Sequence, residues 1–247
     1  QTHLEQGLAL CDAQPRRSRE SFVSIRVEVA VLNYAGWLLW HLGYPDQALQ
    51  KSEAMCTLAH EWADPFNVAA AQVFAAMTHQ LRCERALTQE RAEAGVTLAG
   101  ELGFPNWLAQ GTVQQGWALA EQGQVEEGIA RIRQGLAMHQ AMGTGLLNSY
   151  YLALLAEMQG KAGQADEGLA ALAEALALVE KNEERFYEAE LWRMKGELAL
   201  RAGEKAKREK GEKGEIPDPR AQILEPKAQG EAEACFLKAI AVAQKQQ

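Results

Sequence analysis

Apolar residues recur at helical spacing along most of the 247-residue chain. A spacing of three and four residues puts such side chains on one face of a helix. Residues 125–142 show this stripe at Ile129, Ile132, Leu136 and Met138–Ala141, and residues 165–182 show it at Leu169, Leu172, Leu176 and Val179. The stretch SIRVEVAVL, residues 24–32, alternates briefly like a strand but also fits a helix. Because helices are expected on all sides of it, we expect a helix there too.

The pattern repeats with a period of 40 residues. The segment AEQGQVEEGIARIRQGLAMH begins at residue 120, and GKAGQADEGLAALAEALALV begins at residue 160. Other residues keep the same or double interval: Gly43, Gly123, Gly163 and Gly203; Trp37 and Trp117; Pro65 and Pro105. The second unit, around HQLRCERAL, lacks the glycine of this series. A long period of this kind is the signature of a stack of similar structural units.

Each unit is predicted to be a pair of antiparallel helices. Small residues recur where the paired helices would cross: Gly116, Ala156 and Gly196 in first helices, and Ala48, Gly128, Gly168 and Ala232 in second helices. A short side chain lets two helix axes approach closely, which explains glycine in helix interiors despite its cost of ~1 kcal/mol. One pair cannot bury its apolar stripe alone, so the pairs must stack. The expected fold is a single all-α domain, a right-handed superhelical solenoid.

The expected repeats are residues 22–62, 66–102, 105–142, 146–182 and 184–246. Residues 2–11 would be the second helix of an earlier, truncated unit, and residues 12–24 a polar connection. The chain begins without Met and in the middle of the pattern, so we expect it to be a fragment of a longer protein.

The amino-acid composition limits the kinds of molecule that the protein is expected to bind and its expected location. The formal net charge is −8 and the pI about 5.3, whereas a nucleic-acid-binding surface needs clustered Lys and Arg, so we expect no nucleic acid partner. No apolar run reaches the ~18–20 residues of a membrane span, and the N-terminus does not have the pattern of a signal peptide. The four cysteines are far apart and suit reduced thiols, so a cytoplasmic location is expected.

These features resemble the tetratricopeptide repeat. The last unit shows it best, with Ala232, Phe236 and Ala239 in EAEACFLKAIAVA, although the units here exceed that family's usual ~34 residues. The phrases GYPDQAL, GWALAEQGQ, EGLAALAEALALVE and ERFYEAELWRMKGELAL look more specifically like the C-terminal repeats of large bacterial signalling proteins. Such proteins combine an adenylate/guanylate cyclase-like domain with an AAA (STAND-type) ATPase. This resemblance implies a non-catalytic regulatory role for the repeats.

A charged insert interrupts the last repeat. Residues 204–229 hold seven basic and six acidic residues and three prolines. This composition predicts a flexible loop in place of a tight turn. The frequent alternation of charge sign does not favour a strong polyanion-binding segment. A tolerated insertion and a basic docking segment remain the two alternatives.

Catalytic motifs are incomplete. HEWAD, from His60, resembles the start of a zinc-protease helix, but Asp64 stands where the second histidine would be needed. QGKAG, residues 159–163, has a glycine–lysine pair without the preceding glycine or the following Ser/Thr of a phosphate-binding loop. Acid pairs such as Glu126–Glu127 suit helix starts through the helix dipole. We therefore expect no catalytic residue, metal or cofactor.

A binding surface is predicted on the first helices, which line the concave face of such a stack. Projecting the repeat phase gives fourteen candidates: Asn33, Trp37, Trp40, His41, His79, Gln110, Trp117, Glu121, Tyr150, Glu157, Lys161, Glu190, Arg193 and Glu197. An extended peptide or a helix could lie there with Trp side chains as anchors. The competing interpretation is that Trp37 and Trp117 belong to the core between repeats.

Two functions follow from this reading. The main hypothesis is a protein–protein interaction and regulatory scaffold that binds a protein or peptide. The alternative is an intramolecular spacer that positions adjoining cyclase or ATPase domains and has no partner in trans. Self-association is also possible, because uncapped solenoid ends expose apolar residues such as Phe236, Leu237 and Ile240.

Overall fold

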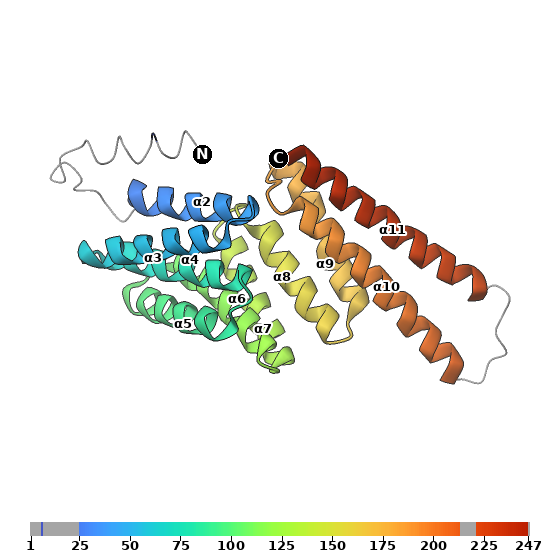
Figure 1. The fold of residues 1–247 in the computed structure, drawn as a ribbon. Coiled ribbons are helices and arrows are strands. Elements are labelled where there is room, and N and C mark those ends of the chain that lie inside the picture. Colours follow the sequence, from blue (N-terminus) through green and yellow to red (C-terminus); the bar gives the residue numbers. More distant parts are fainter. Residues whose placement is uncertain (1–5, 7–24, 213–220, 247) are drawn as a thin grey trace. The chain divides into compact units, whose positions relative to one another are not determined.

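The computed structural model describes Gln6, residues 25–212 and residues 221–246. All regular secondary structure in these ranges is helical, and the helices pack as antiparallel neighbours (Figure 1). The expected all-α fold of stacked helix pairs is therefore confirmed. The chain divides into two compact units, Gln1–Met142 and Gly143–Gln247.

Residues 25–142 of the first unit form three helix pairs. Its helices are α2 (Val27–His41), α3 (Pro45–Glu61), α4 (Pro65–Leu81), α5 (Arg85–Leu102), α6 (Pro105–Glu121) and α7 (Val125–Ala141). The first helix of the central pair, α4, packs against its own partner α5, against the first helices α2 and α6, and against α3. This enclosure buries most of the circumference of α4, which accordingly has a run of buried residues from Ala69 to Gln80.

The described residues of the second unit form two helix pairs. They are α8 (Asn148–Lys161) with α9 (Ala165–Asn182), and α10 (Glu188–Glu212) with α11 (Ala221–Gln246). Helix α10 packs against both α9 and α8. Glu184 joins the two pairs, because its carboxylate accepts hydrogen bonds from the Leu147 backbone N–H (2.8 Å) and the Ser149 hydroxyl (3.1 Å) at the start of α8.

The helix starts reproduce the period seen in the sequence. Second helices begin at Pro45, Arg85, Val125 and Ala165, at intervals of 40 residues. The ambiguous stretch at residues 24–32 is helical from Val27 onward, as expected. Residues of the predicted stripes, among them Ile132, Leu172 and Val179, are fully buried.

The turns explain why glycine recurs. A residue with left-handed backbone dihedral angles follows the C-terminal end of nearly every helix, and these residues are 20 positions apart. Glycine fills this position at Gly43, Gly103, Gly123, Gly143 and Gly163, and other residues fill it at Ala63, Cys83 and Glu183. Glycine adopts this conformation without the steric penalty of a Cβ atom. In the second pair, where the sequence lacks the glycine, Cys83 takes the left-handed conformation itself (φ 58°).

The helix crossings explain the second set of glycines. A Cβ atom on Gly116 of α6 would lie 2.7 Å from the backbone oxygen of Gly128 and 2.7 Å from the backbone nitrogen of Ile132, both on α7. A Cβ atom on Gly128 would lie 2.5 Å from the Gly116 oxygen. The two backbones are therefore in direct contact, which no larger residue permits at either position.

The structure differs from the sequence expectation at the charged insert. Helix α10 continues to Glu212 and α11 begins at Ala221, so residues 204–212 and 221–229 are helical where a loop was expected. For residues 204–212 the physical reason is that Glu, Lys, Ala and Arg are strong helix formers, and no proline occurs between residues 204 and 216. Residues 221–229 are helical although Pro226 lies among them. Residues 213–220 lie outside the described residues. So do the expected N-terminal helix and connection over residues 2–24, apart from Gln6.

Candidate functional site

Five of the predicted partner-binding residues are buried in the structure. Asn33, His79, Gln110, Trp117 and Tyr150 are each less than 8% exposed. Repeat phase alone misplaced them at the surface, because a first helix is covered by its own second helix and by its neighbours. Trp117, at 2% exposure, lies in the core, as the competing interpretation held. These side chains are not available to a partner in this conformation.

The other predicted residues reach the surface. His41, Lys161 and Arg193 are exposed, and Trp37, Trp40, Glu121, Glu157, Glu190 and Glu197 are half-buried. In the first unit, Trp37 makes edge-to-face contacts with Tyr34 (ring centroids 5.7 Å apart) and Phe74 (6.2 Å). Phe74 in turn contacts Trp107 at 5.2 Å. Trp37 therefore begins a row of rings that joins α2, α4 and α6.

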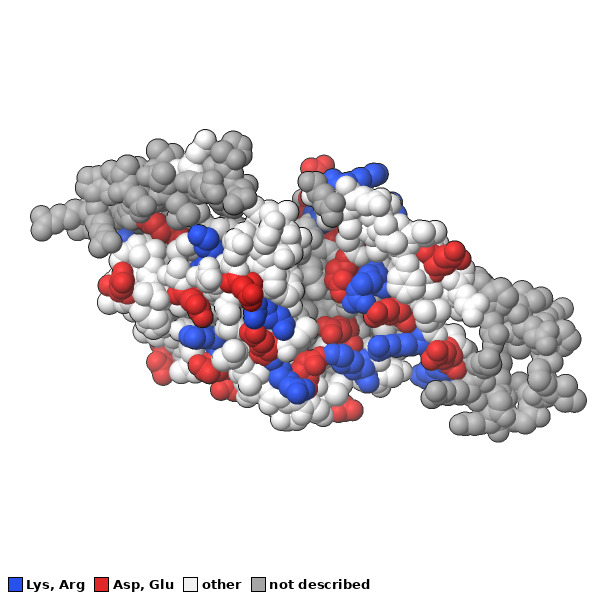
Figure 2. Space-filling model, viewed as in Figure 1, with Lys and Arg blue, Asp and Glu red and all other residues white. Residues whose placement is uncertain are grey.

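In the second unit the surface residues form a charged ladder, which we define as Glu157, Lys161, Glu190, Arg193 and Glu197. Lys161 donates to Glu157 at 3.1 Å within α8. Arg193 of α10 lies between Glu190 and Glu197 and pairs with both. Because α8 and α10 are in contact, the ladder occupies adjacent first helices. Figure 2 shows acidic and basic side chains interspersed over the part of this face where these helices lie.

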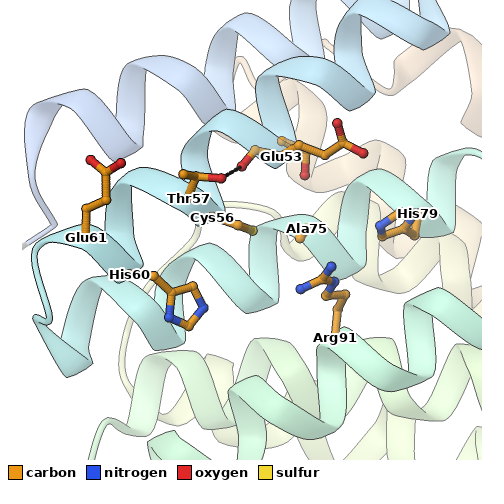
Figure 3. A pocket seen from close by; sticks show the side chains of 9 residues that line it. Glu53, Cys56, Thr57, His60, Glu61, Ala75, His79 and Arg91 are labelled. Atoms are coloured by element: carbon orange, nitrogen blue, oxygen red, sulfur yellow. Dashed lines mark hydrogen bonds between the residues drawn. The ribbon is translucent and has the colours of Figure 1, made fainter.

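A pocket of about 640 Å³ lies between second helices α3 and α5, with α4 at its floor. It is lined by Ser52, Glu53, Cys56, Thr57, His60 and Glu61 of α3, Ala75 and His79 of α4, and Arg91 of α5. Figure 3 shows the Arg91 side chain extending from α5 toward α3, with Cys56 on one side and His79 on the other. This volume falls in the range of pockets that hold small molecules.

The side chain of Gln72, on α4, contacts two of the groups that line the pocket. Arg91 Nη1 donates to the Gln72 Oε1 atom at 3.3 Å, and Gln72 Nε2 lies 3.3 Å from His60 Nε2. The Nε atom of Arg91 is buried without a hydrogen-bond acceptor among the described residues. Burial raises the pKa of the Cys56 thiol, although Arg91 opposes the shift. Cys56 therefore remains a neutral thiol and does not neutralise the guanidinium.

His79 is fixed by a carboxylate next to the pocket. Its Nδ1 atom lies 2.6 Å from the Glu84 carboxylate, which also accepts from Arg82 Nε at 2.8 Å. Burial opposes the charge on Glu84, but the hydrogen bonds from His79 and Arg82 outweigh it and hold the pKa of Glu84 below its usual value. The pairing leaves His79 Nε2, the other ring nitrogen, as the group that can meet a ligand.

Of these pocket residues, sequence reasoning placed only His79 in a site, and it placed His79 on the wrong surface. A signal was present: the 40-residue period aligns Ser52 with Ala92, Ile132 and Leu172, all completely buried. A hydroxyl at a position that is otherwise apolar core marks this unit as different. Among the described residues, no cluster of three or more His, Cys, Asp or Glu could hold a metal ion.

Comparison with known proteins shows which solved structures have a similar fold. No protein-family model matches the chain. No curated protein sequence matches it. Among solved structures, BtubC from P. vanneervenii is similar with a TM-score of 0.57 and 13% identity, over 98% of this chain and 87% of that one. The apo form of RapI gives a TM-score of 0.53 with 11% identity, over 96% and 88%.

Aspartyl phosphate phosphatase F from Bacillus subtilis gives a TM-score of 0.52 with 15% identity, over 88% of this chain and 60% of that one. At these identities the likeness concerns the fold alone. The chain thus has the fold of tetratricopeptide-like helical repeat proteins. No helix in the described residues combines the length and apolar character that crossing a membrane requires.

Proposed function

We propose that the chain is a non-catalytic interaction module whose first helices contact a protein or peptide partner. The observation that carries the proposal is the charged ladder of α8 and α10. Its members are paired within their own helices, so their side chains are already ordered before a partner arrives. Ordered charges of both signs contribute more to the choice and orientation of a binding partner than to the affinity for it.

The first unit offers a second contact of a different character. Trp40 is half-buried and His41 is exposed at the end of α2, next to the row of rings that begins at Trp37. Half-buried tryptophans can anchor an interface, because they add large apolar area at little entropic cost. The proposed partner surface of this unit therefore comprises Trp37, Trp40 and His41 rather than the buried Trp117.

The finer proposal concerns the parent protein. The resemblance to the C-terminal repeats of bacterial cyclase-like and ATPase signalling proteins supports a regulatory role, in which the module couples partner binding to adjoining domains. Sequencing the flanking gene tests it directly. Cyclase or ATPase domains next to this chain would support the proposal, and their absence would remove it.

Site-specific photo-crosslinking tests the interaction module itself. A crosslinking residue at position 197 of α10, which leaves the Arg193–Glu190 pair in place, should capture a protein or peptide in trans in the native host. The same residue at the exposed position 174 of α9 is the matched control and should capture none. Arg193→Glu in a chain that carries the crosslinker at position 197 should reduce the yield.

The alternative function, an intramolecular spacer, predicts another outcome of the same experiment. Crosslinks from position 197 would then be absent or would join only segments of the parent chain. Equal yields from positions 197 and 174 would also contradict the proposal, because a specific surface must give a higher yield than an arbitrary exposed one.

A further inference from the structure

The pocket between α3 and α5 contains polar groups that have no hydrogen-bond partner among the described residues. The Ser52 hydroxyl makes no hydrogen bond among the described residues, although Ser52 is only 4% exposed. The buried Arg91 Nε atom likewise has no acceptor. A buried donor without an acceptor costs about 1–3 kcal/mol, and this applies to the Arg91 guanidinium. The Ser52 hydroxyl lines the same cavity, so a ligand that accepts hydrogen bonds from both side chains is favoured.

The charge of the pocket indicates the kind of ligand. Arg91 makes no ion pair with any carboxylate among the described residues, and its single hydrogen bond goes to the neutral amide of Gln72. A guanidinium has the planar fork that matches a carboxylate. Glu53 and Glu61 are exposed at the rim of the pocket, and their negative charges disfavour a ligand of high negative charge such as a polyphosphate.

The neighbouring repeats show that stacking does not require this polar lining. At the position of Ser52, the next three second helices have the buried apolar residues Ala92, Ile132 and Leu172. At the position of His79, helices α2 and α6 have Leu39 and Leu119. Helix pairs of this kind therefore form with an apolar residue at either place, although α8 has the buried Gln159 at the position of His79 and α7 has Arg131 at the position of Arg91. Of the four aligned second-helix positions, only that of Ser52 has a polar residue.

From these observations we propose that the pocket binds a small organic molecule with a single carboxylate. The Arg91 guanidinium and the Ser52 hydroxyl hold the carboxylate, and His79, positioned by Glu84, donates or accepts at its free ring nitrogen. The remaining volume receives the body of the molecule against Ala75 and Cys56. This site lies between the second helices α3 and α5 with α4 at its floor, and it shares no residue with the partner surface proposed above.

Benzoate is a suitable probe, and benzamide is its neutral counterpart of nearly the same shape. We expect benzoate to shift the side-chain Nε–Hε signal of Arg91 in the NMR spectrum of arginine-labelled protein, with saturation in the millimolar range. Benzamide should bind at least tenfold more weakly, which corresponds to about 1.4 kcal/mol. Equal binding of the two would overturn the proposal, and so would no saturable shift with benzoate.

Variants distinguish the site from general affinity for anions. Arg91→Gln should abolish benzoate binding, and Ser52→Ala should weaken it about tenfold. Arg131→Gln is the matched control, because Arg131 is exposed on α7 at the position that corresponds to Arg91 one repeat later. Binding that survives Arg91→Gln would contradict the proposal. If Arg91→Gln does not fold, Arg91→Lys, which keeps the charge without the fork, should still weaken binding several-fold.

Discussion

At the scale of single residues, backbone conformation determines where glycine is tolerated or required. Ala63 has a left-handed backbone (φ 50°) at the end of α3, whereas the equivalent turns after α5 and α7 have Gly103 and Gly143. A left-handed conformation costs a non-glycine residue about 1–2 kcal/mol, because its Cβ approaches the following carbonyl oxygen. Replacing such a residue with glycine removes this strain. It also raises the conformational entropy of the unfolded chain, which offsets part of the gain in stability.

Exchanging these residues should change stability in opposite directions. We expect Ala63→Gly to raise the free energy of unfolding by about 0.5–1 kcal/mol and Gly103→Ala to lower it by about 1 kcal/mol. A Cβ atom on Gly103 would meet no other atom within 4 Å, so the loss reports backbone strain alone. Urea unfolding of both variants measures the difference, and a stabilising Gly103→Ala would contradict the explanation.

The Glu84 carboxylate makes stability depend on pH. Its pKa in the folded protein is depressed, so its contribution is present above the unfolded value of about 4.3 and is lost as the pH falls through the folded pKa. Glu84→Gln should therefore lower the free energy of unfolding at pH 7 by about 1 kcal/mol or less. The difference from the wild type should shrink below pH 4. The exposed Glu90→Gln serves as control, and a difference that is constant with pH would contradict the assignment.

At the scale of helices, close backbone contact decides which glycines matter. The Cβ atom of Gly116→Ala would meet backbone atoms of α7 at 2.7 Å, and backbone cannot move aside cheaply. Gly100 of α5 has open space around it within 4 Å. We expect Gly116→Ala and Gly128→Ala each to destabilise by about 2 kcal/mol or more, and Gly100→Ala to stabilise by up to about 1 kcal/mol. Thermal and urea unfolding check these values, and equal effects at the three positions would contradict the packing account.

The sequence predicted elements better than it predicted surfaces. Helical periodicity and the 40-residue interval located the helix pairs, because each pair must bury one apolar stripe. The turn at Cys83 occurs at the same 20-residue interval as the glycine turns, although it has no glycine. Helices α4 and α5, which it joins, are held in place by the neighbouring helices they pack against. Repeat phase left both a surface and a core position open for Trp117 and placed Tyr150 at the surface, since the number of neighbours around a first helix is a property of the stack. The only sign of the pocket in the sequence is that Ser52 is polar where the aligned positions of the other repeats are apolar.

At the scale of the whole molecule, solvent-exposed apolar side chains predict self-association of the chain. Leu237 and Ile240 of α11 are 60% and 54% exposed. They lie three residues apart and so share one face of the helix. We expect concentration-dependent association of the chain, measured by sedimentation or light scattering. Replacing both residues with Lys should abolish it, and replacing the exposed Glu233 and Lys245 with Ala should not. A strict monomer at high concentration would contradict this expectation.

The central claim is that the helix pairs nest through direct backbone contact at their repeated small residues. The most direct measurement is a nuclear Overhauser cross-peak between the α-protons of Gly116 and Gly128 in glycine-labelled protein. The account predicts a strong cross-peak, because the backbones of α6 and α7 touch at these two residues. Assigned glycine signals with no cross-peak between them would contradict it.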